Sequence, residues 1–167
     1  MKLGVICDGI SRDLAHSLNV MDEFGLEYAE LQFVGDKEVG DHSKTEIKEI
    51  VTLLRDRGKP VSCLSRHIFA GMTSQNKPGD ELHLKHMDAL KRVVEMAHIV
   101  GSPFVRIMTQ KKEQILWGFH GAEKWNVAHG AWDSMPPLIE PAVDFARSAG
   151  VKLAVETGNG TMVNSNY

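Results

Sequence analysis

The sequence predicts a parallel α/β fold made of repeated strand and helix units, and two observations carry this prediction. Short apolar segments alternate with segments of helical periodicity, without a hairpin signal between them. Each connection from a helix to the next strand is tight and contains a glycine, whereas connections from strand to helix are long and rich in His, Trp, Asn and Asp. The functional site is therefore expected at the edge of the sheet where the strands end. A (βα)₈ barrel and a doubly wound sheet both place their sites at that edge, so the loops alone do not separate them.

Five segments have the length and apolar character of strands. They are residues 2–7, 27–34, 61–64, 104–108 and 151–155. The last reads VKLAV, and its near-continuous apolarity is typical of a strand covered on both faces. Between the second strand and the next helix, the sequence predicts a polar, glycine-punctuated loop over residues 35–42.

Four helices are expected to connect these strands. The first begins near Asp13, the second after a capping box of Ser43 and Glu46, the third at Glu81 and the fourth near Ser134. Each is expected to end at a glycine, because glycine readily adopts the left-handed conformation that closes a helix. These glycines are Gly25, Gly58, Gly101 and Gly150.

Composition limits the class of protein. The chain has 167 residues, 43% hydrophobic and 25% charged, so we expect a single domain with one sizeable core. The formal net charge is −3 and Lys and Arg are not clustered, so a nucleic-acid partner is not expected and a small molecule is favoured. There is no apolar run of transmembrane length and no secretion leader, so we expect no membrane partner and a cytoplasmic location. The two cysteines are expected to be reduced packing residues.

Glu156 is the strongest candidate for chemistry. It follows the last strand directly, and a carboxylate at the carboxyl end of a buried strand is costly unless a cation or hydrogen-bond donors receive it. The alternative is a carboxylate that only caps the next loop. Glu30 and Arg106 lie within strands, where a charge must be paired or face a barrel interior. A structural ion network between them is favoured over a direct role in substrate binding.

The histidines and tryptophans could serve either a binding site or the packing of the protein. His67 follows the third strand and could contact a substrate or only hydrogen-bond within its loop. His83 and His86 lie one turn apart on the third helix, and we expect them on its solvated face rather than at a metal. The irregular stretch 109–133 contains all three tryptophans, Trp117, Trp125 and Trp132. It is either a lid with apolar walls for a substrate or a satellite core under a long loop.

Several short patterns, in the same order along the chain, resemble a known family. They are YAELQF on the second strand, the S-x-H of Ser65 to His67, FVRIM on the fourth strand and LAVETGNGTMVNS around the fifth. Together they resemble the xylose-isomerase-like TIM-barrel superfamily of sugar isomerases, epimerases and inosose dehydratases. The resemblance implies a parallel (βα)₈ barrel of TIM type, with about five of the eight βα units present in this chain.

The resemblance also implies a site. In that superfamily the glutamate that ends the fifth strand is catalytic and binds a divalent metal, Mn, Mg, Co or Zn, and it corresponds here to Glu156. The histidine after the third strand corresponds to His67, and Trp117 and Asn159 are expected to join it around a small sugar substrate. The other metal ligands belong to later strands, and we expect them beyond Tyr167. The chain is accordingly expected to be a single barrel domain over 1–167 that is incomplete at its C-terminus. It is either a fragment of a longer enzyme, which we favour, or a naturally shortened form. We expect it to associate as a homo-oligomer because the sheet edges stay open.

The implied activity is isomerisation or epimerisation of a small sugar through an enediolate. Alternatives are dehydration of an inosose-type polyol on the same barrel, or a non-catalytic sugar-binding barrel that has lost its metal. A metal-dependent abasic-site nuclease shares the barrel, but it requires a basic face that the composition does not provide.

Overall fold

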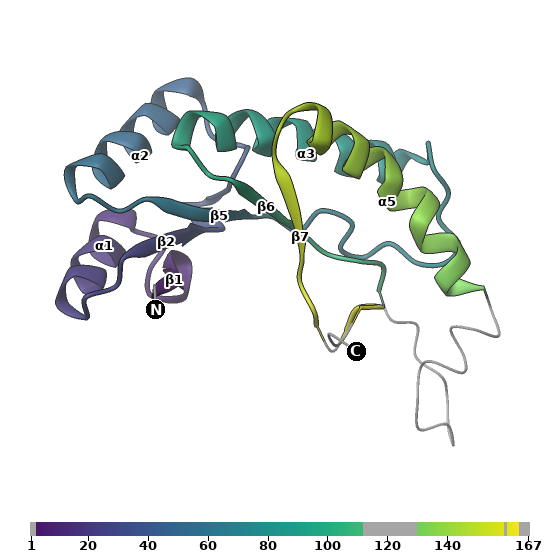
Figure 1. Ribbon diagram of the computed structural model, residues 1–167, viewed down its shortest axis with the longest axis horizontal. Coiled ribbons are helices and arrows are strands. Elements are labelled where there is room, and N and C mark those ends of the chain that lie inside the picture. The colour runs from purple at the N-terminus through teal and green to yellow at the C-terminus, as the bar shows by residue number, and fades with distance from the viewer. Residues whose placement is uncertain (1–2, 112–129, 159, 164–167) are drawn as a thin grey trace, which may run out of the picture.

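The computed structural model describes residues 3–111, 130–158 and 160–163. Its main feature is a five-stranded parallel sheet, flanked by helices (Figure 1). In sheet order the strands are β1 (Gly4–Ile6), β2 (Tyr28–Leu31), β5 (Val61–Ser65), β6 (Phe104–Ile107) and β7 (Lys152–Val155). The helices are α1 (Leu14–Glu23), α2 (Lys44–Asp56), α3 (Glu81–Val100) and α5 (Ala131–Ser148), and the short 3₁₀ helix η1 (Cys7–Gly9) follows β1.

The order of the strands in the sheet equals their order along the chain. A doubly wound sheet reverses this order at its switch point, whereas a (βα)₈ barrel advances by one strand at each crossover. The helices contact one another in the same sequence, α1 with α2, α2 with α3 and α3 with α5. Figure 1 shows α2, α3 and α5 along one face of the sheet. The predicted parallel α/β fold is confirmed, and its winding is that of part of a barrel.

The two faces of the sheet have different chemistry. Residues at alternating positions of the central strands are fully buried and belong to one core with the helices: Ala29, Leu31, Leu64, Val105 and Ile107. Because side chains alternate along a strand, the residues between them point to the opposite, inner face. The register pairs Glu30 with Cys63, and Arg106 with Ser65 on one side and Ala154 on the other. Polar and charged groups therefore line the inner face.

The predicted helix boundaries are largely confirmed. Gly25, Gly58, Gly101 and Gly150 all follow helix ends with φ between 59° and 74°. Ser43 and Glu46 form the expected capping box. The prediction near Ser134 is wrong by one turn, since α5 begins at Ala131 after Gly130, whose carbonyl accepts the N–H of Ser134 at 3.0 Å. Trp132 consequently belongs to α5 and not to an irregular loop.

The loop predicted over residues 35–42 contains an antiparallel hairpin, so this prediction is wrong in part. Strand β3 (Phe33–Val34) pairs with β4 (Lys37–Glu38), and Gly35, with φ of 61°, begins the turn between them. The second strand is correspondingly shorter than predicted, because β2 ends at Leu31. Gly-Asp at positions 35 and 36 is a suitable two-residue turn, since such tight hairpins require a positive φ.

The prediction that His83 and His86 lie on a solvated face is also wrong. His83 is 3% exposed; its Nδ1 accepts the Gly79 N–H at 3.2 Å and its Nε2 donates to the Leu138 carbonyl at 2.9 Å. Phe69, from the loop between β5 and α3, stacks on the His83 ring with centroids 6.0 Å apart and lies 5.8 Å from the His86 ring. His83, in the first turn of α3, is buried because this loop and α5 cover it.

Two expectations from composition can be compared with the structure. In the described part of the chain, no helix is long and apolar enough to cross a membrane. Cys7 and Cys63 are both free, and burial raises the pKa of the Cys7 thiol to about 12, so Cys7 is a packing residue as predicted.

Candidate functional site

Four side chains of the inner face meet at the carboxyl end of the sheet. Ser65 Oγ, at the end of β5, donates a hydrogen bond to Glu30 Oε1 of β2. Arg106 Nη1, on β6, forms an ion pair with Glu156 Oε2, directly after β7. Glu30 and Arg106 were expected to pair with each other, but in the described residues Arg106 pairs with Glu156 and Glu30 accepts the hydrogen bond of Ser65. The side chain of Glu156 is 43% exposed, although its Oε2, which faces Arg106, is buried.

Arg106 is the buried member of this pair. Its side chain is 11% exposed, and its Nε and Nη2 have no hydrogen-bond partner among the described residues. Burial lowers the pKa of Arg106, and the neighbouring carboxylate of Glu30 opposes this shift. An arginine stays protonated under such conditions, so a fixed positive charge lies beside Glu156.

His67 lies at the same edge of the sheet, directly after β5. Its backbone N–H donates to Glu38 Oε1 at 3.0 Å, and its Nδ1 lies 2.7 Å from the same oxygen. Gln32, just past the end of β2, places its amide nitrogen 3.1 Å from His67 Nε2. The imidazole is 45% exposed, and it therefore combines a fixed position with access from outside.

Arg66 anchors the backbone next to His67. It is 7% exposed, donates through Nη1 to the Val39 carbonyl and pairs with Asp41 at 2.7 Å. Partial burial favours the neutral form of Asp41, but hydrogen bonds from Arg66 and Arg92 outweigh it and hold the pKa of Asp41 below its usual range. The hairpin and the β5–α3 loop are thereby joined by charged contacts.

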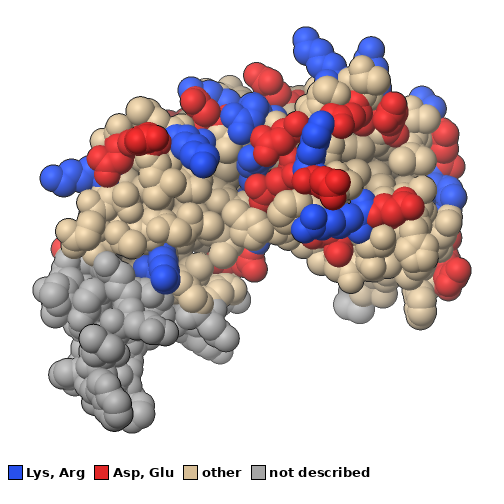
Figure 2. All heavy atoms as spheres, turned by 180° about the vertical axis from the view of Figure 1, so that it is seen from behind, with Lys and Arg blue, Asp and Glu red and all other residues tan. Residues whose placement is uncertain are grey.

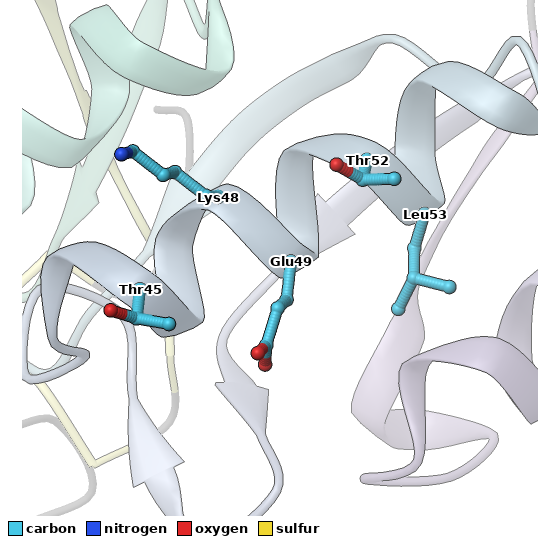
Figure 3. A pocket seen from close by; sticks show the side chains of 5 residues that line it. All are labelled: Thr45, Lys48, Glu49, Thr52 and Leu53. Atoms are coloured by element: carbon cyan, nitrogen blue, oxygen red, sulfur yellow. The ribbon is translucent and has the colours of Figure 1, made fainter.

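Two hollows on the described surface lie elsewhere, on and beside α2. One of about 420 Å³ is lined by Thr45, Lys48, Glu49, Thr52 and Leu53, and Figure 3 shows that all five side chains come from the single helix α2. These residues alternate with the buried stripe of α2, so the hollow is on its outer side, away from the inner face of the sheet. On the face shown in Figure 2, basic and acidic side chains are interspersed, which is not the surface of a nucleic-acid-binding protein.

Comparison with known protein families identifies the family of this chain. A family model described as a xylose isomerase-like TIM barrel matches residues 18–167. The chain belongs to this family. No curated protein matches the chain.

Solved structures similar to this xylose isomerase-like chain agree on the fold. IolI, solved with a bound zinc atom, is 20% identical with a TM-score of 0.65, and the match covers 98% of this chain and 55% of IolI. L-ribulose 3-epimerase is 18% identical with a TM-score of 0.64, covering 96% and 51%. AsbF of Bacillus anthracis, described as the probable 3-DHS dehydratase involved in petrobactin synthesis, is 14% identical with a TM-score of 0.62, covering 98% and 54%. The chain spans about half the length of these proteins.

The described residues do not fit a complete divalent-metal site. Such a metal needs several oxygen or nitrogen donors, and no group of three or more His, Cys, Asp or Glu side chains suited to a metal occurs within 3–111, 130–158 and 160–163. Glu156 offers one carboxylate, and its Oε2 faces Arg106. Any further ligands have to come from outside the described part of the chain.

The predicted site residues have different outcomes. Glu156 and His67 both lie at the carboxyl edge of the sheet, after β7 and β5. Trp117 and Asn159 lie outside the described residues, as does Trp125, so their predicted roles stay predictions, as does the homo-oligomer. Sequence reasoning missed Glu38, the partner of His67. A Gly-Asp pair between Val34 and Lys37 was the available signal for the hairpin that carries it.

Proposed function

We propose that this chain contributes to a divalent-metal-dependent isomerase or epimerase that acts on a small sugar or sugar derivative. Membership of the xylose isomerase-like barrels supports an enzyme of this class, and L-ribulose 3-epimerase and zinc-containing IolI share its fold. The observation that carries the proposal is the location of Glu156. It lies half-exposed at the carboxyl end of a barrel strand, where such folds handle their substrates, beside a buried arginine.

In this proposal Glu156 has two roles. Its carboxylate is one metal ligand, completed by residues outside the described part of the chain, and it takes part in moving a proton at the carbon next to the sugar carbonyl. Removal of that proton gives an enediolate, and return of the proton to the neighbouring carbon or to the opposite face gives the isomer or the epimer. When bound, the divalent ion supplies positive charge at the reacting oxygens.

Other residues of the chain hold this carboxylate and the substrate. Arg106 pairs with Glu156 and keeps it on the inner face of the sheet. His67 contacts a substrate hydroxyl from the end of β5, and Trp117 and Asn159 are proposed to complete the pocket.

Dehydration of a cyclic polyol is the second candidate. Elimination of water next to a carbonyl begins with the same proton removal. AsbF, which is described as a probable dehydratase, shares the fold, and this similarity supports dehydration as an alternative. A non-catalytic sugar-binding barrel would keep the pocket without the metal.

One experiment separates the three. The full-length protein is purified, its metal content is measured by mass spectrometry, and it is incubated with ketoses, aldoses and inososes in D₂O while NMR spectra are recorded. An isomerase or epimerase incorporates deuterium beside the carbonyl and yields a stereoisomer or positional isomer. Olefinic signals would replace the proposal with the dehydratase. Sugar binding without metal or exchange would establish the non-catalytic alternative.

A further inference from the structure

We propose that Glu38 is a positioning residue that fixes one tautomer of His67, so that the imidazole Nε2 accepts a hydrogen bond from a substrate hydroxyl. This inference rests on the proposed function and deepens it, because it assigns the group that His67 recognises. It also gives a role to the β3–β4 hairpin, which the barrel scaffold itself does not require.

The first step is the fixed location of the Glu38 carboxylate. Its side chain is 17% exposed, and both of its oxygens face donors of the β5–α3 loop. Oε1 accepts the backbone N–H of His67 at 3.0 Å, and Oε2 lies 3.5 Å from Nε of Arg66. Arg66 is itself held by Val39 and Asp41, so the carboxylate and its surroundings are anchored from both sides.

The second step is the tautomer of His67. Nδ1 lies 2.7 Å from Oε1 of Glu38, and an ionised carboxylate only accepts hydrogen bonds, so the proton of the neutral imidazole resides on Nδ1. Nε2 is then an acceptor. The amide nitrogen of Gln32, a donor, lies closer to Nε2, at 3.1 Å, than to Nδ1, at 3.4 Å, which agrees with this assignment. A substrate hydroxyl that binds Nε2 takes the place of this amide.

The third step is the access of a ligand to Nε2. Phe33 of the same hairpin lies beside the imidazole with ring centroids 6.2 Å apart, and the guanidinium of Arg12 covers the Phe33 ring at 4.6 Å. Phe33, tilted by 44° to the imidazole, lies on one side of it, while the His67 side chain remains 45% exposed. A fixed, exposed acceptor binds a substrate hydroxyl, which donates a hydrogen bond to it. An analogue with a carbonyl or a hydrogen at the same position cannot donate this bond and should bind more weakly.

The test uses the full-length protein labelled with ¹⁵N-histidine, in the wild type and in Glu38→Gln, with Asp36→Asn as the matched control. Asp36 is an exposed carboxylate in the turn of the same hairpin, so its replacement removes an equal charge without the His67 contact. Long-range ¹H–¹⁵N spectra above pH 8 should show His67 protonated on Nδ1 in the wild type and in Asp36→Asn. Glu38→Gln should give a mixture with the Nε2–H form, and Glu38→Asp should restore part of the original signal.

Steady-state kinetics give the second readout. Glu38→Gln should raise KM by about tenfold, the loss of one well-oriented hydrogen bond, with a smaller change in kcat, whereas Asp36→Asn should change neither. An Nε2–H tautomer in the wild type would overturn the proposal whether or not any sugar is turned over. A changed tautomer in Glu38→Gln with an unchanged KM would overturn it as well. Inactivity of the wild type on every sugar, with the Nδ1–H form present and lost in Glu38→Gln, would count against the proposed function but support the positioning by Glu38.

Discussion

Arg106 and Glu156 form an ion pair across the neighbouring strands β6 and β7. The register explains the pair, since Arg106 lies opposite Ala154 and Glu156 follows two residues later on the same face. A buried cation and a half-exposed carboxylate are therefore joined at the edge where a barrel enzyme works. This relationship leads to the first two predictions.

Replacing Glu156 by Gln should remove turnover from the full-length protein and weaken metal binding, while the fold is retained. The amide keeps the shape of the side chain but loses the negative charge that a metal and a proton transfer require. We expect kcat to fall by about 100-fold or more, measured together with metal content and a circular dichroism spectrum. Glu140→Gln, on the exposed side of α5, is the control and should retain full activity. A kcat for Glu156→Gln within about twofold of the wild type would remove this residue from the site.

Replacing Arg106 by Met should lower the free energy of unfolding, because the carboxylates near it lose their counter-charge on the inner face. Since Glu156 is 43% exposed and partly screened by water, the expected loss is about 1–3 kcal/mol and less than that of a fully buried pair. Arg106→Lys should lose less, because it keeps the charge. Urea denaturation measures the change, and Arg92→Met, which breaks an exposed pair with Asp41, is the matched control. Equal losses in the two Met variants would show that burial of Arg106 is not important for stability.

Replacing Gly40 by Ala should destabilise the protein strongly. Its φ is 89°, and an added Cβ would lie 2.9 Å from the backbone nitrogen of Val93 in α3. Backbone strain and the contact together should cost about 3 kcal/mol or more. Gly71→Ala is the control, because Gly71 has a similar φ of 83° but open space around it, and it should cost about 1–2 kcal/mol. Similar melting temperatures for both variants would contradict the close approach of Gly40 to α3.

Stability should fall on mild acidification, and His86 should be one cause. Burial lowers its pKa in the folded protein, so the unfolded chain binds the proton more readily. The contribution of His86 to the free energy of unfolding is therefore fully present above the unfolded pKa of about 6.5 and is lost as the pH falls from there toward the folded pKa.

Asp22 acts in a lower pH range. Its pKa is lowered by hydrogen bonds from Lys59 and Arg57, so its contribution to stability is lost only below about pH 4 and does not overlap with that of His86.

Urea denaturation between about pH 7.5 and 5 checks this prediction. His86→Gln should flatten the decline of the unfolding free energy with falling pH, whereas His16→Gln, the loss of an exposed histidine on α1, is the control. An unchanged slope in His86→Gln would assign the acid sensitivity of the fold to other groups.

The sequence by itself determined the local features of the chain. The strand segments, the capping box of Ser43 and Glu46, and the helix ends at Gly25 and Gly101 depend on residues within one or two turns of each other, and the structure confirms them. The four short sequence patterns on and after the predicted strands were also sufficient to recognise the family. The position of Glu156 at a strand end followed from the apolar run before it.

Only the tertiary structure decided which of these features meet. The partner of Arg106, the burial of His83 and the contact of Glu38 with His67 all join segments that are distant along the chain. Such contacts depend on strand register and on the packing of loops against helices, where a shift of one residue would turn a side chain to the other face. A local pattern carries no information on that register. For this reason the candidate residues could be predicted individually, but their pairing could not.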